Sequence, residues 1–172
     1  MSTFVTVGNA QQPFDRLLME VARALGSLPE PVVVQCGHTR FSSDACEVVD
    51  FLNPAAYQAQ IQRAQLLIMH AGAGSVLHAL KAGRFPILVP RLHRHGEHVN
   101  DHQVAFARQL EQAGRALVVE DIAQLRSVVA QALSRVASPV PAGAQSLVRE
   151  LRSRLDLYGQ QLRSVPSPKK NS

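Results

Sequence analysis

The chain alternates between two patterns of apolar residues. Short runs rich in valine, isoleucine and leucine are typical of buried strands and occupy residues 3–7, 31–35, 47–51, 66–69, 86–89 and 116–119. Between most of these runs, apolar residues recur at helical spacing, which predicts helices over residues 17–25, 54–64, 75–82, 101–112 and 122–134. Since parallel neighbours need long connections, this order predicts an α/β fold with a single Rossmann-like, doubly wound parallel sheet.

A proline-containing stretch, SPVPAG at residues 138–143, interrupts the alternation. We therefore expect one domain over residues 1–138, a linker and amphipathic helix over 139–163, and a disordered tail over 164–172. The last helix has an apolar stripe and an arginine-rich opposite face. It either packs on its own domain or reaches a partner or a membrane surface.

Composition narrows the classes of protein. With 172 residues, 46% of them hydrophobic, the chain can bury one sizeable core. We find no signal peptide, no run of about 18 apolar residues and no metal or redox spacing of the two cysteines, so we expect a cytoplasmic protein. The formal charge of +5 allows anionic ligands, but the 5% aromatic content offers no stacking platform, which argues against nucleic acid as a partner.

The segment HAGAGS, residues 70–75, lies between a predicted strand and a predicted helix. Glycines let a backbone approach a ligand closely, and unpaired amides at a helix start attract an anion, so the segment is a candidate phosphate site. Ser75 can cap the helix or donate to the phosphate. A dinucleotide fingerprint needs a third glycine where Leu77 stands, and no Walker sequence is present. The alternative is a purely structural glycine turn.

A second polar segment, PRLHRHGEHVNDHQ at residues 90–103, follows the predicted strand 86–89. Open α/β sheets bind ligands at the carboxyl ends of their strands, so this position favours function. Arginines in the segment can offset phosphate charge, and its mixed donors and acceptors suit sugar hydroxyls. The latter are Glu97, Asn100, Asp101, His102 and Gln103.

Histidines are concentrated here, since six of the seven lie between His70 and His102. His98 and His102 have a spacing that could bind zinc, but Val99 stands where the zinc protease pattern needs glutamate. We therefore expect ligand contacts or a solvated loop rather than a metal site. No serine triad, carboxylate pair or cysteine nucleophile can be assembled from spacing.

The first predicted strand ends in the turn VGNAQQPF. Gly8 allows a sharp turn, and Asn9 and Gln12 are placed to touch a phosphate or an acceptor. The alternative is an ordinary loop in which Asn9 caps the next helix.

Taken in order, five segments resemble the small glycosyltransferase subunits of bacterial exopolysaccharide and capsule synthesis. These segments are FVTVGNAQQPFDRLL, VVVQCGHT, VVDFL, HAGAGSVLHALKAG and VPRLHRHGEHVNDHQ. Such subunits are single-domain relatives of the C-terminal half of family 28 transferases, and of the catalytic subunit of the two-chain enzyme that adds the second N-acetylglucosamine to dolichol-linked precursors. The resemblance, from Thr3 to about Ala132, implies the C-terminal, donor-binding half of a GT-B glycosyltransferase that is split into two chains.

The resemblance and the loop chemistry together give roles to individual residues. By similarity, the turn from Gly72 to Ser75 would hold the pyrophosphate of UDP, and Phe51 would lie by the uracil. All residues expected to bind the nucleotide or its phosphates are Gly8, Asn9, Phe51, Leu52, His70, Gly72, Ala73, Gly74, Ser75 and His78. Those expected at the sugar are Arg91, Asn100, Asp101 and Gln103.

One position departs from the family. Relatives commonly carry an acidic residue that accepts hydrogen bonds from the ribose, where this chain has His78. A neutral imidazole has one acceptor nitrogen, so we expect His78 to bind one hydroxyl at most.

The resemblance also implies a mechanism: an inverting UDP-sugar-dependent hexosyltransferase that needs no metal or other cofactor. Glu97 and His98 are the candidate bases in this chain, unless the base comes from the partner. The implied partner is a membrane-anchored subunit that binds a lipid-linked saccharide acceptor, which would place the complex at the inner face of the cytoplasmic membrane. The alternative, motivated by His78 and the missing acceptor half, is a non-catalytic nucleotide-sugar-binding or regulatory subunit.

Overall fold

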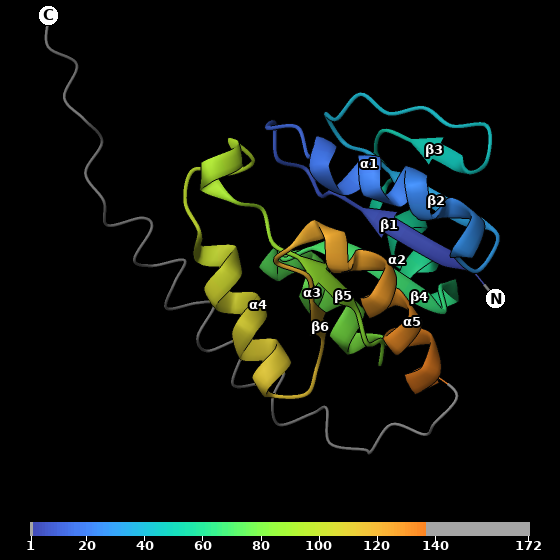
Figure 1. Ribbon diagram of the computed structural model, residues 1–172. Helices are drawn as coiled ribbons and strands as arrows, with labels where there is room; N and C mark the ends of the chain where they lie inside the picture. Colours follow the sequence, from blue (N-terminus) through green and yellow to red (C-terminus); the bar gives the residue numbers. More distant parts are fainter. Residues whose placement is uncertain (1, 137–172) are drawn as a thin grey trace, which may run out of the picture. The chain divides into compact units, whose positions relative to one another are not determined.

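Six parallel strands form one sheet in residues 2–136, the part of the chain that the computed structural model describes (Figure 1). Their order across the sheet is β3-β2-β1-β4-β5-β6. The register places Val5 of β1 between Val34 of β2 and Ile68 of β4. The strands are β1 (Thr3–Thr6), β2 (Val32–Gln35), β3 (Glu47–Val49), β4 (Leu66–His70), β5 (Ile87–Val89) and β6 (Leu117–Val118).

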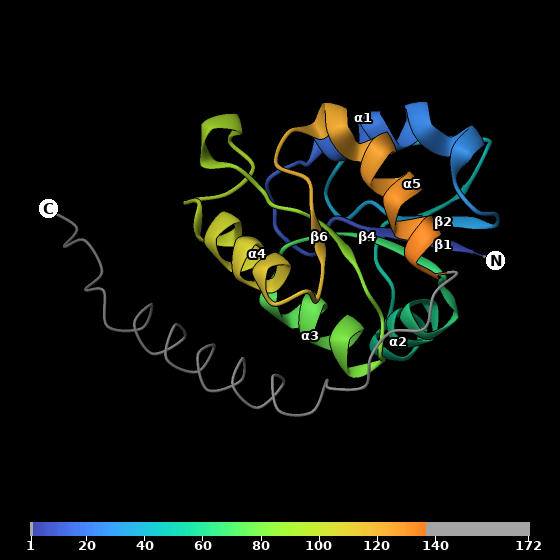
Figure 2. The same ribbon diagram turned by 60° about the horizontal axis from the view of Figure 1, so that its bottom comes forward.

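Helices cover both faces of the sheet. In Figure 2, α1 and α5 lie on one face, and α2, α3 and α4 lie on the other. The α-helices are α1 (Asp15–Ala24), α2 (Pro54–Arg63), α3 (Ala73–Lys81), α4 (His102–Gln112) and α5 (Leu125–Val136). Residues 2–136 also contain three short 3-10 helices, η1 (Leu25–Ser27), η2 (His93–His95) and η3 (Ile122–Gln124). None of the helices in the described part of the chain has the length and apolar character needed to span a membrane.

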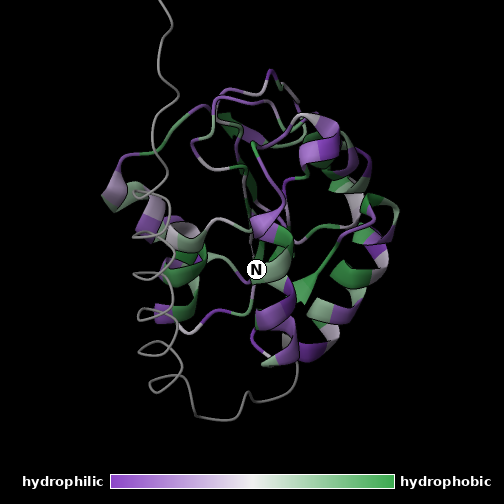
Figure 3. Cartoon of the chain, turned by 90° about the vertical axis from the view of Figure 1, so that its left-hand side faces the viewer, coloured by the Kyte–Doolittle hydropathy of each residue, from purple (hydrophilic) through white to green (hydrophobic). Residues whose placement is uncertain are grey.

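The core lies on both sides of the two central strands. Every residue of β1 and β4 is buried, as expected for a parallel sheet with helices on both faces. On α1, the apolar spacing turns Leu17, Leu18 and Val21 inward while Met19 stays exposed. Figure 3 shows the resulting mixture of hydrophobic and hydrophilic residues along each helix. The apolar faces of the helices therefore pack on the sheet, and the loops that follow the strands lie at one edge of it.

The predicted single doubly wound parallel sheet is confirmed, and all six predicted strands occur. Most boundaries differ from the predicted ones by one to three residues. The difference that matters for the site is at α3, which begins at Ala73 rather than Ser75, because the extended backbone of Gly72 already allows Val76 N–H to donate to the Gly72 carbonyl. The predicted linker, terminal helix and tail over 139–172, together with the domain boundary at 138, lie outside the described residues.

Candidate functional site

The strand order changes direction at β1 and β4, which are neighbours in the sheet. From β1 the chain adds β2 and β3 on one side, and it then returns to add β4, β5 and β6 on the other side. After β1 the chain passes into α1 on one face, and after β4 it passes into α3 on the opposite face (Figure 2). Such a switch point opens a crevice at the carboxyl ends of the two strands, the usual ligand position in open α/β sheets. The turns at Gly8 and Gly72 therefore meet at this crevice.

The imidazole of His70 fills the space between these two glycines. A Cβ placed on Gly8 would lie 2.3 Å from His70 Cε1, and one placed on Gly72 would lie 2.1 Å from His70 Nε2. Gly8 also has φ of +76°, a conformation that side chains disfavour. Neither turn can carry a side chain while His70 keeps this position.

His70 is neutral at neutral pH. Burial lowers the pKa of His70 to about 4, and the positive charge of Arg91 acts in the same direction. Its Nδ1 is buried without a hydrogen-bond partner among the described residues. The crevice floor is thus an uncharged imidazole that retains one unused polar atom.

The first turn of α3 offers unpaired amides to the crevice. The first helical hydrogen bond runs from Val76 N–H to the Gly72 carbonyl at 3.0 Å, so the N–H groups of Ala73, Gly74 and Ser75 have no partner in the helix. Gly74 is exposed, and an added Cβ would meet no described atom within 4 Å. Because the helix begins earlier than predicted, Ser75 is not the capping residue and its hydroxyl is released from that role.

Two residues that the sequence analysis placed in the site lie in the interior. Arg91 has 0% exposure, and its guanidinium lies 4.6 Å from the centre of the Phe14 ring and donates to backbone carbonyl groups. Glu97 is 4% exposed, pairs with Arg16 at 2.9 Å and accepts a hydrogen bond from the N–H of Leu92. In this geometry Glu97 and the two Nη atoms of the Arg91 guanidinium are engaged by protein groups, while Arg91 Nε has no partner among the described residues. The sugar-binding role of Arg91 and the catalytic role of Glu97 stay predictions.

Three other polar residues of the same loop lie nearer the surface. Asp101 is exposed, and its Oδ1 accepts a hydrogen bond from the N–H of His93 at 2.8 Å. The rings of His98 and His102 are 4.8 Å apart and perpendicular, and His98 Nδ1 accepts from the N–H of Asn100 at 3.4 Å. Burial lowers the pKa of His102, and His98 adds to the effect. Of the two candidate bases, only His98 keeps some solvent exposure.

Gln103 is placed differently from Asp101. It is buried, and its Oε1 accepts a hydrogen bond from the backbone N–H of Arg91 at 3.1 Å. Gln103 therefore joins the start of α4 to the loop after β5. Of Asp101 and Gln103, both predicted at the sugar, only Asp101 is exposed.

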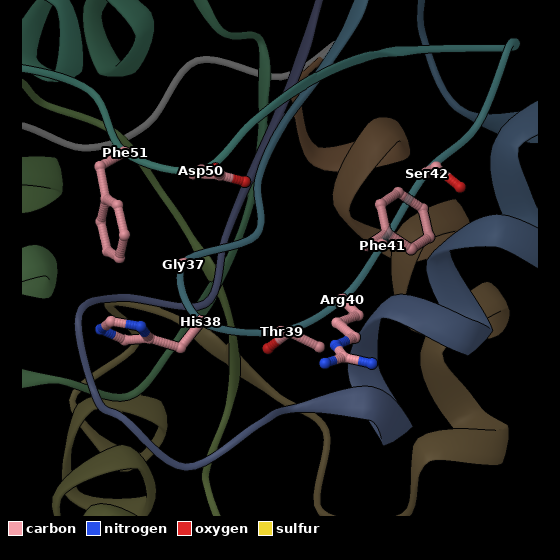
Figure 4. Close-up of a pocket in the computed structure, with 8 residues that line it drawn as sticks. All are labelled: Gly37, His38, Thr39, Arg40, Phe41, Ser42, Asp50 and Phe51. Atoms are coloured by element: carbon pink, nitrogen blue, oxygen red, sulfur yellow. The ribbon is translucent and has the colours of Figure 1, made fainter.

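An open pocket of about 560 Å³ lies beside Phe51, at the ends of β2 and β3 (Figure 4). Phe51 is 48% exposed, and its ring meets that of His38 edge to face at 5.0 Å. A Cβ on Gly37 would lie 3.8 Å from Phe51 and 2.7 Å from the carbonyl oxygen of Gly8. Gly37, which lines the pocket, therefore packs against the turn at Gly8. Its lining residues are Gly37, His38, Thr39, Arg40, Phe41, Ser42, Asp50 and Phe51.

His78 is exposed on α3, one to two turns beyond the glycine turn. Its Nδ1 lies 3.1 Å from Oε1 of Gln58, which can only accept a hydrogen bond. Nδ1 therefore carries the proton in the neutral ring, and Nε2 is left as the acceptor.

A second hollow of about 350 Å³ lies between α4 and the end of β6. Arg108 and Glu120 form a salt bridge in it, and Arg108 lowers the pKa of Glu120. No three side chains of the His, Cys, Asp and Glu types come together as metal ligands within residues 2–136.

Several residues of the site were not found from the sequence. His38 and Arg40 follow a strand end, so the rule that located residues 90–103 applies to them as well. Arg16 and Thr39 bond to loops far away in sequence, the first to Glu97 and the second to the N–H of Phe14 at 2.9 Å. No local pattern in the sequence indicates such contacts.

Comparisons with known proteins give one family. The profile of the glycosyltransferase family 28 C-terminal domain matches residues 2–153. The UDP-N-acetylglucosamine transferase subunit ALG13 of Homo sapiens is 31% identical over 101 residues, which are 59% of this chain and 8% of that protein. The protein of the same name from Yarrowia lipolytica (strain CLIB 122 / E 150) is 37% identical over 62 residues, 36% of this chain and 30% of that protein. The chain thus spans a minor part of the length of these relatives.

Solved structures resemble the chain over nearly its whole length. The glycotransferase of kitacinnamycin has a TM-score of 0.62 and 23% identity, over 96% of this chain and 43% of that one. MurG of Acinetobacter baumannii has a TM-score of 0.54 and 21% identity, over 88% and 49%. At these identities the likeness concerns the fold, and it confirms the predicted equivalence to the C-terminal half of a GT-B glycosyltransferase.

The two glycines of the turn after β4 should respond differently to substitution. We predict that Gly72→Ala lowers the free energy of unfolding by about 1–3 kcal/mol, because the new methyl group collides with His70. Gly74→Ala should leave stability unchanged or raise it by about 0.5–1 kcal/mol, since it fills open space on a helix. Urea denaturation measures both. Equal losses in the two variants, or no relief of the Gly72→Ala loss by a second change, His70→Ala, would contradict the packing described.

Burial of His70 should make stability depend on pH. Its pKa of about 4 in the folded chain lies below the ordinary value of 6.5, so the unfolded chain binds more protons between these values. Stability should therefore fall as the pH drops from 6.5 towards 4, by on the order of 3 kcal/mol from this residue alone. Urea denaturation between pH 7.5 and 4.5 should show a shallower loss for His70→Asn than for the wild type. A ring resonance of His70 that titrates near pH 6.5 would refute the assignment.

Proposed function

Since this chain belongs to the glycosyltransferase family 28 C-terminal domain family, we propose that it binds a UDP-sugar at the crevice between β1 and β4 and takes part in transfer of the sugar. The observation that carries the proposal is the meeting of two glycine turns, at Gly8 and Gly72, at the switch point of the sheet. The ALG13 relatives are named as subunits of a UDP-N-acetylglucosamine transferase, which supports a nucleotide sugar as the ligand.

The pyrophosphate belongs on the first turn of α3. The amides of Ala73, Gly74 and Ser75 are unpaired there and lie at the positive end of the helix dipole. Gly74 leaves open space for the close approach of a phosphate. His70, Gly8 and neighbouring Asn9 form the facing side of the crevice.

The nucleoside extends from this turn along the strand ends. Phe51 and Leu52 follow β3, and the exposed ring of Phe51 offers an apolar face to the uracil. His78 receives the ribose, because Nε2 is the acceptor that its bond to Gln58 leaves free. The exposed Asp101 and the half-buried Asn100, on the loop after β5, are the polar groups assigned to the sugar.

Transfer requires a base that deprotonates the acceptor hydroxyl while the bond between sugar and phosphate breaks. The unpaired amides of α3 stabilise the charge that develops on the leaving UDP, without a metal ion. Glu97 is committed to Arg16, so the base is either His98 or a residue of a second chain. We propose an inverting reaction on this scheme.

A transferase needs a second surface to hold the acceptor and exclude water, and the ALG13 relatives are named as subunits, which supports a second polypeptide as the source of that surface. We propose a membrane-anchored subunit that presents a lipid-linked saccharide, in exopolysaccharide or capsule synthesis, at the inner face of the cytoplasmic membrane. The engagement of Glu97 also favours a second candidate function, a nucleotide-sugar-binding subunit without a catalytic group of its own.

Binding of UDP to the purified chain tests the proposal. Calorimetry should detect UDP and UDP-N-acetylglucosamine, and Gly74→Val should weaken both by at least about tenfold, because its bulk displaces the phosphate from the α3 amides. The helix tolerates valine no worse than glycine, so a folded variant is expected. NADH serves as the control ligand. Failure to bind UDP, or equal affinity for NADH, would overturn the assignment.

Transfer of labelled sugar to membrane lipid, measured with and without the co-expressed membrane subunit, separates the two functions. Turnover that appears on mixing supports the transferase. Donor binding without any turnover in the complex supports the non-catalytic subunit.

The ribose role of His78 gives a second, independent prediction. His78→Ala should weaken UDP about two- to tenfold, the range of one hydrogen bond, because Nε2 no longer accepts from a ribose hydroxyl. Its affinity for 2′,3′-dideoxy-UDP should equal that of the wild type, since this ligand lacks the hydroxyls. His78→Glu should recover or exceed the wild-type affinity for UDP. A parallel loss for both nucleotides would place His78 elsewhere.

A further inference from the structure

Two loops of the donor site meet on one buried guanidinium. Arg91 Nη2 donates to the carbonyl of Val7 at 2.8 Å, and Nη1 donates to those of Gln12 at 2.8 Å and Glu97 at 3.1 Å. Val7 and Gln12 flank the turn after β1, whereas Glu97 lies in the loop after β5. One side chain therefore holds backbone from both loops.

The backbone of Arg91 extends the same connection to α4. Its N–H donates to Oε1 of Gln103, in the first turn of that helix, at 3.1 Å. The helix start that carries Asp101 is thus fastened to the residue whose side chain holds the turn at Gly8.

A second arginine ties the loops in parallel. Arg16 Nε and Nη2 each donate to one carboxylate oxygen of Glu97 at 2.9 Å, and Nη2 also donates to the carbonyl of Pro90. Glu97 Oε2 accepts from the N–H of Leu92 as well. This two-point pairing fixes orientation as well as distance between α1 and the loop after β5.

Charge and shape both select arginine at position 91. The side chain has 0% exposure and stays cationic at neutral pH, because burial lowers its pKa only to about 10. A planar guanidinium can address Val7 and Gln12 from separate nitrogens while its face lies over Phe14. A lysine has one nitrogen and cannot span the same carbonyl groups.

We propose that Arg91 is the positioning residue of the donor site, which sets the separation between the turn at Gly8 and the loop that carries Asp101. The inference rests on the proposed function, because it gives these loops a common ligand. Arg91 acts through the backbone of both loops and touches no ligand itself. Among the described residues, Arg91 makes no hydrogen bond to the phosphate turn of α3, so the nucleotide and the sugar should depend on Arg91 to different degrees.

Hydrogen exchange in the ligand-free Arg91→Lys chain tests the positioning role. The bonded amides of Gly8, Leu92 and Glu97 should exchange on the order of tenfold faster than in the wild type, because both loops lose their common anchor. Residues 119–124, which Arg91 does not contact, should be unchanged. Arg23→Lys, an exchange of the same residue types at an exposed site, is the matched control. Arg16→Gln should accelerate the same amides less, and it carries the test if Arg91→Lys does not fold.

Calorimetry then connects the loops to the ligand. Arg91→Lys should weaken UDP by about threefold, through the turn at Gly8, and UDP-N-acetylglucosamine by about tenfold or more, because the UDP-sugar meets both loops. Unchanged exchange in both loops would overturn the inference, as would faster exchange with unchanged affinity for both ligands. A wild-type chain that binds neither ligand would instead refute the proposed function, while the exchange result would still decide whether Arg91 couples the loops.

Discussion

Parallel pairing of β1 with both β2 and β4 is the constraint on which the remaining structure depends. It places the carboxyl ends of all six strands at one edge, so residues distant in sequence meet without any local signal. The turn after β1 receives His70 from β4, Arg91 from the loop after β5 and the Thr39 hydroxyl from the loop after β2. The crevice is therefore built from three directions around one short turn.

The polar groups at this edge fall into two sets. Below the surface, Glu97 pairs with Arg16 and the guanidinium of Arg91 donates to backbone carbonyl groups, while Arg91 Nε and Arg16 Nη1 are buried without a partner among the described residues. At the start of α3, the amides remain unpaired in the helix, and the buried His70 beside them is neutral. The first set provides rigidity, while the second keeps its hydrogen-bonding capacity for a ligand.

The sheet and the glycine turn were predictable because their signals are local: β-branched runs, helical spacing and glycines between a strand and a helix. The buried positions of Arg91 and Glu97 were not predictable. Both lie in a polar segment that reads as a surface loop, and their partners, from Val7 to Arg16, are more than 70 positions away. The predicted start of α3 was wrong for a related reason. A serine before a helical pattern suggests a capping residue, which favoured Ser75, whereas the sequence does not indicate that the backbone of Gly72 is extended.

The packing of His70 limits which substitutions positions 8, 70 and 72 can accept. Its ring occupies the volume that a side chain at position 8 or 72 would need, so the three positions behave as a single unit. A change at Gly72 is accessible only after the imidazole has become smaller, whereas shrinking the imidazole first opens a void between the turns. Gly8 stays constrained in either case by its φ of +76°, so a redesign of this crevice must change positions 70 and 72 together and keep Gly8.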